Sequence, residues 1–186
     1  MDLTTGDTQL IIKTCKSEGV SVTQAAYLLA TTYHETNFTM KPVREAYWLS
    51  EGWRQRNLRY YPFYGRGHVQ LTWDYNYVKA SKAFNIDLLK YPDKVMDTEI
   101  SVKVLVRGCM EGWFTGKALP TYVNDTKKNY VGARRVVNGV DKASAIAGYA
   151  VEYENLLITS GYDKTPVKSA TTFWETLKQL FERLGF

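Results

Sequence analysis

The chain has 186 residues, of which 45% are hydrophobic and 23% are charged, and its formal net charge is +5 at pH 7. This length suits one domain with a short appendage, and the composition excludes a fibrous or intrinsically disordered chain. The longest wholly apolar run, residues 25–30, is too short for a membrane-spanning helix, which needs about 20 residues.

The distribution of charge and cysteine indicates where the chain is made and what it meets. Residues 1–7 are acidic rather than basic, and no apolar segment follows them, so we expect synthesis in the cytoplasm without a signal peptide. The positive charge favours polyanions in general, namely nucleic acid, anionic lipid or an acidic bacterial wall, and its sign alone does not choose among them. Because the lysines and arginines form no clustered stripe, a nucleic-acid partner is disfavoured. Cys15 and Cys109 fall on apolar faces of predicted helices, so we expect buried free thiols.

Helical patterns dominate the first third of the chain. Residues 5–18 predict a helix that stops at Gly19. Ser21 and Gln24 have the spacing of a capping box, which predicts a second helix running from Val22 to His34 or Glu35. Residues 37–63 show little periodicity beyond a short helical segment at 49–57, but their aromatic content indicates an ordered excursion over a functional site.

The remainder of the chain alternates turn signals with helical periodicity. Residues 61–67 predict a turn, residues 68–72 a short strand, and Asp74 the cap of a helix that reaches Phe84. Further helices are predicted from Asp97 or Thr98 to Phe114, over residues 128–137, and from a cap at Asp141 through Leu157.

The domain organisation predicted from these patterns has three parts. A catalytic domain covers residues 1–160, a linker covers residues 161–170, and an amphipathic helix covers residues 171–186. We expect the apolar face of this helix to pack on the domain or on a second copy; contact with a membrane surface is the alternative. We expect the protein to be a monomer.

Three glutamates lie close together in the sequence, in a stretch rich in aromatic residues. Hydrolysis of a glycosidic bond usually needs one protonated carboxyl group and one carboxylate. Glu35 is the candidate acid, because the negative end of a helix and burial beneath tyrosines both favour a protonated carboxyl group. Glu45 and Glu51 are the two candidates for the second carboxylate.

Other kinds of site have less support in this sequence. The glycines around Arg66 lack the spacing of a phosphate-binding loop. His34 and His68 are the only histidines, and their positions fit neither a zinc-binding helix nor a supported Ser-His-Asp triad. We therefore expect neither a metal nor a cofactor.

A sequence of motifs indicates a particular family. His34-Glu35-Thr36, an acidic excursion, the run from Tyr64 to Thr72, and Val137-Asn138-Gly139 follow one another in the order found in glycoside hydrolase family 19. The chain resembles this family, which contains chitinases and phage endolysins, over roughly residues 20–158. The resemblance implies a mainly α, lysozyme-like α+β domain with a small β element near Val69, beside the active-site cleft.

The resemblance also implies roles for individual residues. Glu35 would be the general acid of an inverting reaction, a downstream glutamate the general base, and Thr72 would help to hold the attacking water. Glu45 matches the base of phage and bacterial members and is favoured; Glu51 matches the plant pattern and is the alternative base. The expected substrate-binding residues are His34, Tyr64, Arg66, Gln70, Asn76 and Asn138.

The biological function follows from how the chain departs from plant members of the family. It lacks their secretion signal, cysteine bridges and lectin-like module, and so resembles the phage branch. We therefore expect an endolysin that cleaves β-1,4 bonds in the glycan strands of bacterial peptidoglycan, after release from the cytoplasm of the infected host to the wall. The alternatives are a chitinase of the same fold and a non-catalytic wall-binding or virion protein.

Overall fold

The computed structural model describes residues 1–162 and is built around one central helix, α2 (Val22–Glu35). The predicted capping box is present: the Ser21 hydroxyl accepts a hydrogen bond from the Gln24 amide, and the Gln24 side chain accepts one from the Ser21 amide. Most of α2 is buried, and α7 (Ala143–Thr159) packs along it. The cap fixes where the helix begins, and Glu35 is its last residue.

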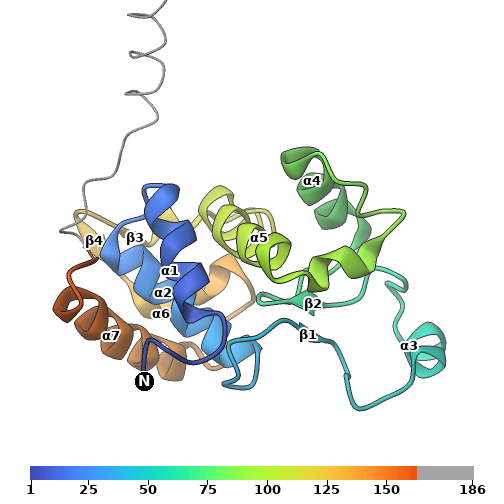
Figure 1. Ribbon diagram of the computed structural model, residues 1–186, viewed down its shortest axis with the longest axis horizontal. Helices are drawn as coiled ribbons and strands as arrows, with labels where there is room; N and C mark the ends of the chain where they lie inside the picture. The colour runs from blue at the N-terminus through green and yellow to red at the C-terminus, as the bar shows by residue number, and fades with distance from the viewer. Residues whose placement is uncertain (163–186) are drawn as a thin grey trace, which may run out of the picture.

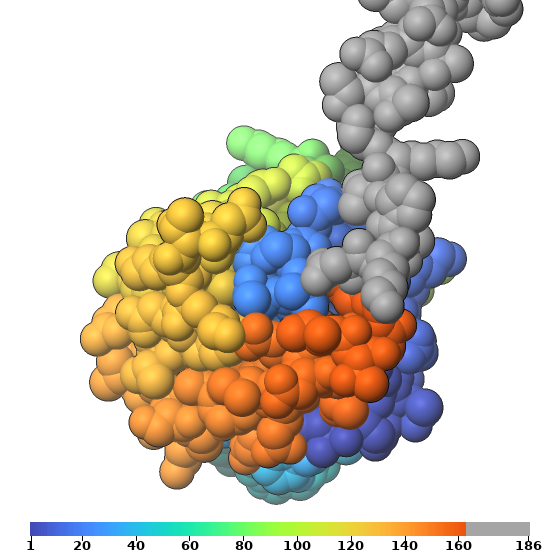
Figure 2. Space-filling model, turned by 90° about the vertical axis from the view of Figure 1, so that its left-hand side faces the viewer, coloured from blue at the N-terminus to red at the C-terminus, as the bar shows by residue number. Residues whose placement is uncertain are grey.

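The other helices divide between a helical body and a smaller flanking region (Figure 1). The body contains α1 (Thr8–Ser17), α5 (Thr98–Glu111), α6 (Tyr130–Ala133), α2 and α7. On the other side of Figure 1 lie α3 (Glu51–Asn57) and α4 (Asp74–Phe84), reached through extended chain. Figure 2 shows α7 running across one face of the body, beside the segment around residues 120–135. Glu35 therefore belongs to the body, whereas Thr72 and Asn76 belong to the flanking region.

Two short antiparallel hairpins supply the β structure. β1 (Val43–Arg44) pairs with β2 (Arg66–Gly67), and β3 (Val123–Asn124) pairs with β4 (Lys127–Lys128). The strand predicted at residues 68–72 is wrong in its bounds, because Gln70 has a φ of +55° and turns the chain back, leaving a single bridge between Arg66 and Leu71. The predicted small β element beside the cleft is nevertheless confirmed, as is the mainly α class.

Short 3-10 helices and later helix boundaries differ from the sequence prediction. One 3-10 helix, η1 (Pro92–Met96), precedes α5, and another, η2 (Leu119–Thr121), precedes β3. The single helix expected over residues 128–137 is instead α6 followed by the 3-10 turn η3 (Arg134–Val136). Asp141 does not cap α7, which begins at Ala143 after Lys142 in the left-handed conformation.

The core and the chain end bear on three further expectations. Cys15 and Cys109 are buried free thiols, as predicted, and burial raises the pKa of both. Within residues 1–162, no helix is long and apolar enough to cross a membrane.

Tyr162 is buried and its hydroxyl donates a hydrogen bond to the Val20 carbonyl oxygen, so the first residues of the expected linker pack on the domain. The rest of that linker and the helix expected at 171–186 lie outside the described residues.

Candidate active site

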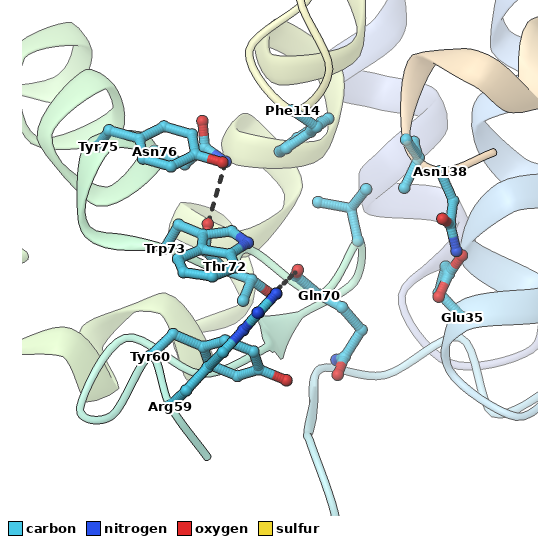
Figure 3. Close-up of a pocket in the computed structure, with 12 residues that line it drawn as sticks. Glu35, Arg59, Tyr60, Gln70, Thr72, Trp73, Tyr75, Asn76, Phe114 and Asn138 are labelled. Atoms are coloured by element: carbon cyan, nitrogen blue, oxygen red, sulfur yellow. Dashed lines mark hydrogen bonds between the residues drawn. The ribbon is translucent and has the colours of Figure 1, made fainter.

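A cleft runs between the helical body and the flanking region, and it consists of two cavities that share Glu35 and Gln70. The first, of about 350 Å³, is called the Thr72 cavity. The second, of about 450 Å³, is called the Glu45 cavity. The Thr72 cavity is lined by Glu35, Arg59, Tyr60, Val69, Gln70, Thr72, Trp73, Tyr75, Asn76, Phe114, Val137 and Asn138 (Figure 3). The Glu45 cavity is lined by residues 34–37, 43–48 and Gln70.

Glu35 is half-buried at the junction of the two cavities and forms an ion pair. Nη1 of Arg134 lies 2.5 Å from Oε1 of Glu35, and the Arg134 side chain is almost entirely buried. Nε of Arg134 donates a second hydrogen bond, of 3.1 Å, to the carbonyl oxygen of Asp141. Arg134 fixes the position of the Glu35 carboxyl group.

Glu45 is held as a hydrogen-bond acceptor on the opposite side of the cleft. Its Oε1 accepts from the Tyr60 hydroxyl at 2.6 Å, and its Oε2 accepts from the Gly65 amide at 3.0 Å. Nε of Arg54 also donates to the Glu45 carbonyl oxygen at 2.9 Å. Burial and the bond to Glu45 raise the pKa of Tyr60 to about 12, so its hydroxyl remains a donor at neutral pH. These two donors fix the orientation of the Glu45 carboxyl group, which a residue that accepts a proton at a defined position requires.

Glu51, the alternative base, lies elsewhere. Its side chain is 53% exposed and pairs with Arg54 at 3.1 Å on its own helix, α3. It also accepts a hydrogen bond of 3.0 Å from the Tyr64 hydroxyl. The cavity that Glu51 lines contains Tyr61, Pro92 and Asp93 and shares neither Glu35 nor Glu45.

The polar residues expected to hold water and sugar lie around one corner of the Thr72 cavity. The Thr72 hydroxyl donates to the Gln70 carbonyl oxygen at 2.8 Å, and the Asn76 amide donates to the Thr72 carbonyl oxygen at 3.0 Å. The Gln70 amide donates to the carbonyl oxygens of Val43 and Gly67. Asn138 is exposed on the facing wall and its side chain is directed toward Glu35 (Figure 3). The structure therefore brings Thr72, Gln70, Asn76 and Asn138 together with Glu35.

The remaining expected substrate-binding residues differ in their access to the cleft. His34 is half-buried and lines the Glu45 cavity. Tyr64 and Arg66 are buried and line neither the Thr72 cavity nor the Glu45 cavity. The Arg66 guanidinium lies 3.5 Å from the Tyr64 ring centroid and donates to Asp93 at 2.8 Å. These two side chains therefore lie beside the β1–β2 hairpin and outside the lining of the cleft, although Arg66 lines the cavity that contains Glu51.

Some residues of the cleft have unfavourable backbone conformations. Asn37, Ala46, Gln70 and Trp73 line its cavities and have φ angles of +49°, +48°, +55° and +73°. Other residues with side chains and positive φ, such as Asn85 and Lys142, lie outside these cavities. Strain of this kind persists where surrounding contacts over-determine the conformation.

The structure adds residues to the site that sequence reasoning did not single out. Arg134 is 99 positions from Glu35, and no local spacing relates the two. Arg59 and Tyr60 lie in the aromatic excursion, where composition indicated a site but not which side chains face it. Trp73, Tyr75 and Phe114 complete the wall of the Thr72 cavity. An aromatic and amide-rich wall is suited to sugars, which offer both apolar faces and hydroxyl groups.

A second arrangement of polar groups lies outside the cleft. The ring of buried His68 contacts the Ser101 hydroxyl at 2.8 Å through Nδ1 and Asp7 at 3.1 Å through Nε2. Burial lowers the pKa of His68, although Asp7 acts in the opposite direction. His68 and Ser101 are buried, so they are not available to a substrate. Their contacts link Asp7 at the start of α1, His68 after β2 and Ser101 on α5, which is a structural role. Among residues 1–162, no three His, Cys, Asp or Glu side chains are grouped to hold a metal.

The mainly helical fold and the two glutamates along one polar cleft are those of a lysozyme-like glycoside hydrolase. A comparison with known families identifies which family of glycoside hydrolases this is. Residues 19–151 match the family described as class I chitinases, glycoside hydrolase family 19. The chain belongs to this family.

Individual relatives and structures agree with this assignment. The chain is similar to Chitinase 11 of Oryza sativa subsp. japonica, with 32% identity over 131 residues, covering 67% of this chain and 48% of the relative. A stretch of 45 residues is 47% identical to Inactive chitinase-like protein 1 of Hevea brasiliensis, covering 24% of this chain and 14% of that protein. The chain thus spans less than half the length of these relatives. Chitinase C from Streptomyces griseus HUT6037 shares the fold, with a TM-score of 0.59, 21% identity and 81% of each chain covered.

Proposed function

We propose that this protein hydrolyses the β-1,4 bonds of an N-acetylated glycan with inversion, and that bacterial peptidoglycan is its substrate. The observation that carries the proposal is the placement of Glu35 and Glu45 along one cavity, while Glu51 lines another. An inverting reaction needs an acid and a base with space for water between them. The family to which the chain belongs supports the reaction class.

In the proposed mechanism the proton donor is Glu35. Its Oε1 accepts the hydrogen bond from Arg134, so the proton to be transferred would be on Oε2. This proton passes to the glycosidic oxygen as its bond to the anomeric carbon breaks, and the leaving sugar departs with a free hydroxyl group. Substrate binding would assist by excluding water from Glu35, which favours the neutral form of a carboxyl group.

The attacking water would be oriented by Thr72 and deprotonated by Glu45. Because the Thr72 hydroxyl donates its own proton to the Gln70 carbonyl oxygen, its free lone pairs can accept from water. Water that donates one proton to Thr72 and the other to Glu45 presents a lone pair to the anomeric carbon. Its proton then passes to Glu45, whose carboxylate is oriented by Tyr60 and Gly65.

The position of Glu35 between two cavities supports action within a polymer rather than on a single sugar. Sugar units on either side of the broken bond would occupy the Thr72 cavity and the Glu45 cavity. Gln70, Asn76 and Asn138 offer amide groups that can pair with hydroxyl and acetamido groups. Exposed Tyr47 and Trp48 extend the Glu45 cavity with aromatic surface.

Two polymers fit this chemistry, since chitin and peptidoglycan share the β-1,4 linkage and the acetamido groups. The net charge of +5 supports peptidoglycan in an anionic wall, an attraction that salt should weaken. In that case the chain acts as an endolysin, made in the host cytoplasm and active at the wall after release. The names of the relatives support chitin as the second candidate. The inactive relative is the reason to test for turnover directly.

The test is digestion of purified peptidoglycan and of chitin oligosaccharides, followed by mass analysis and by NMR of the first anomer released. We expect wild type to cleave peptidoglycan and to release the α-anomer, and Glu35→Gln to release no product. Cleavage of chitin alone would replace the endolysin proposal with the chitinase alternative. If wild type cleaves neither polymer, the proposed hydrolase function is wrong and a wall-binding role takes its place.

A further inference from the structure

Arg59 is a cation in the cleft that the proposed mechanism does not use. It is exposed and lines the Thr72 cavity, on the wall that faces Glu35 and Asn138 (Figure 3). The other arginine in the lining of the cleft, Arg44, is paired with Asp93 at 2.5 Å. Arg59 forms no ion pair within the part of the chain that the structure describes. Its charge is thus available to a ligand.

The surroundings of Arg59 hold its guanidinium by one face. The group lies 5.0 Å from the centroid of the Trp73 ring. Trp73 is itself fixed, because its amide donates to the Phe63 carbonyl oxygen at 2.9 Å and its ring packs against Tyr60 and Tyr75. Stacking uses the face of a guanidinium and leaves the N–H donors at its edge free. Such an edge matches the two oxygens of a carboxylate.

The positive charge of Arg59 can offset the negative charge that the cleft presents to an acidic substrate. Glu45 faces the cleft and would repel an acidic glycan, whereas Glu35 is already paired with Arg134. A neutral glycan such as chitin can accept hydrogen bonds from an arginine through its hydroxyl and acetamido oxygens, but it carries no charge to pair with the guanidinium. Peptidoglycan carries carboxylates, either on the lactyl ether of its muramic acid units or on its stem peptides.

We propose that Arg59 binds a carboxylate carried by the substrate, and thereby selects an acidic N-acetylated glycan over a neutral one. This inference rests on the proposed function for its substrate. The alternative role on the same geometry is one in which Arg59 acts only on the neighbouring Tyr60–Glu45 pair. That role would affect neutral and acidic substrates equally, and this difference makes the two roles separable.

The first experiment compares cleavage by wild type, Arg59→Gln and Arg59→Lys, with Arg56→Gln as the matched control. Arg56 is an exposed arginine on α3 that lines neither cavity of the cleft, and its loss changes the net charge equally. The substrates are peptide-free glycan strands with free lactyl carboxylates, strands with intact stem peptides, and peptide-free strands whose carboxylates are converted to methylamides.

The Arg59→Gln variant loses one charge-assisted hydrogen bond at an exposed site. Its loss of kcat/KM should therefore be roughly tenfold greater on the acidic strands than on the methylamide strands. Arg59→Lys should recover part of this difference, and Arg56→Gln should show none. Whichever acidic strand shows the larger effect identifies the lactyl group or the peptide as the source of the carboxylate. Equal losses on acidic and neutral strands, or an equal effect of Arg56→Gln, would overturn the inference.

A binding experiment separates this inference from the proposed function. Calorimetry with the Glu35→Gln variant measures binding of the same soluble strands without cleavage. We expect acidic strands to bind more tightly than methylamide strands, and Arg59→Gln added to Glu35→Gln to remove the difference. A protein that fails to cleave but shows this preference loses the hydrolase proposal and keeps the Arg59 site. A protein that cleaves without this preference loses the Arg59 site alone.

Discussion

Arg134 and Glu35 are joined by a hydrogen bond of 2.5 Å between Nη1 and Oε1, although they are 99 positions apart in the chain. The same arginine holds the Asp141 carbonyl oxygen, so it connects the end of α2 to the loop that carries Asn138. The position of the candidate acid therefore depends on the loop that begins at η3 as well as on its own helix.

Substitution of Arg134 should lower activity through the position of Glu35. Arg134→Gln removes a buried cation and leaves the partner carboxyl group without its charged donor, which typically destabilises a protein by about 3–5 kcal/mol. We expect kcat to fall at least tenfold, roughly in line with misplacement of a catalytic group, together with a lower Tm. Arg134→Lys, which keeps the charge but not the planar fork, should recover more of the Tm than of kcat. Full kcat in Arg134→Gln would contradict the positioning role.

Tyr60 should contribute to catalysis by orienting Glu45. Tyr60→Phe removes the hydroxyl that donates to Oε1 of Glu45 at 2.6 Å, while the Gly65 amide still holds Oε2. A hydrogen bond to a charged group is worth about 1.5–3 kcal/mol, so we expect kcat to fall by roughly one to two orders of magnitude with little change in KM.

Tyr61→Phe is the matched control for Tyr60→Phe. Tyr61 stacks on Tyr64 and lines the cavity of Glu51, not that of Glu45. We expect its steady-state kinetics to match wild type. A similar fall in kcat in both variants would indicate that the hydroxyl of Tyr60 has no specific role.

Gly65 should not tolerate a side chain. A Cβ at this position would lie 2.8 Å from Oε1 of Gln70 and 3.3 Å from Oε2 of Glu45. Gly65→Ala must therefore displace two residues of the cleft at once, and we expect a tenfold or greater loss of kcat/KM, roughly the cost of misplacing a catalytic group. Gly148→Ala on α7 is the control, since no atom lies within 4 Å of its added Cβ and Gly148 lines neither cavity of the cleft. Unchanged kinetics in Gly65→Ala would show that the close packing around Glu45 is not needed.

His68 should make the stability of the fold depend on pH. Burial lowers its pKa below the ordinary value of 6.5, so below about pH 6.5 the unfolded chain binds a proton that the folded chain does not. Stability from this residue is present above that pH and is lost as the pH falls toward the folded-state pKa, with a slope of at most about 1.4 kcal/mol per pH unit.

Thermal unfolding between pH 7.5 and pH 5 measures this dependence. Tm of wild type should fall over this range, and His68→Gln should show a flatter profile from a lower starting Tm. Asp7 faces His68 and partly offsets the shift, so Asp7→Asn should steepen the fall. A wild-type Tm that is constant or rises on acidification would contradict the effect of burial.

Local signals in the sequence were sufficient for the helices that begin at a clear cap. α2 and α5 begin where Ser21 and Asp97 predict, because each cap accepts amide hydrogen bonds from the first turn. The strand at 68–72 and the single helix at 128–137 could not be predicted correctly. Their outcome depends on the turn at Gln70 and on the tertiary bonds of Arg134, which propensity does not contain.

The candidate site shows the same division between local and distant information. The order of the motifs predicted that one site contains Glu35, Glu45, Gln70, Thr72, Asn76 and Asn138. In the structure these residues lie along one cleft. Sequence could not separate Tyr64 and Arg66, which are buried, from residues that face the cleft. Nor could it identify Arg134 or Arg59, because their roles arise from contacts between distant segments.

The most direct test of the central claim is the kinetics of Glu35→Gln, Glu45→Gln and Glu51→Gln on the substrate that wild type cleaves. Loss of a general acid or base typically costs about 10²–10⁴-fold in rate. We expect losses of this size for Glu35→Gln and Glu45→Gln, and less than about a fewfold loss for Glu51→Gln, whose exposed side chain lines a separate cavity. An inactive Glu51→Gln beside an active Glu45→Gln would contradict the assignment of Glu45 as the base.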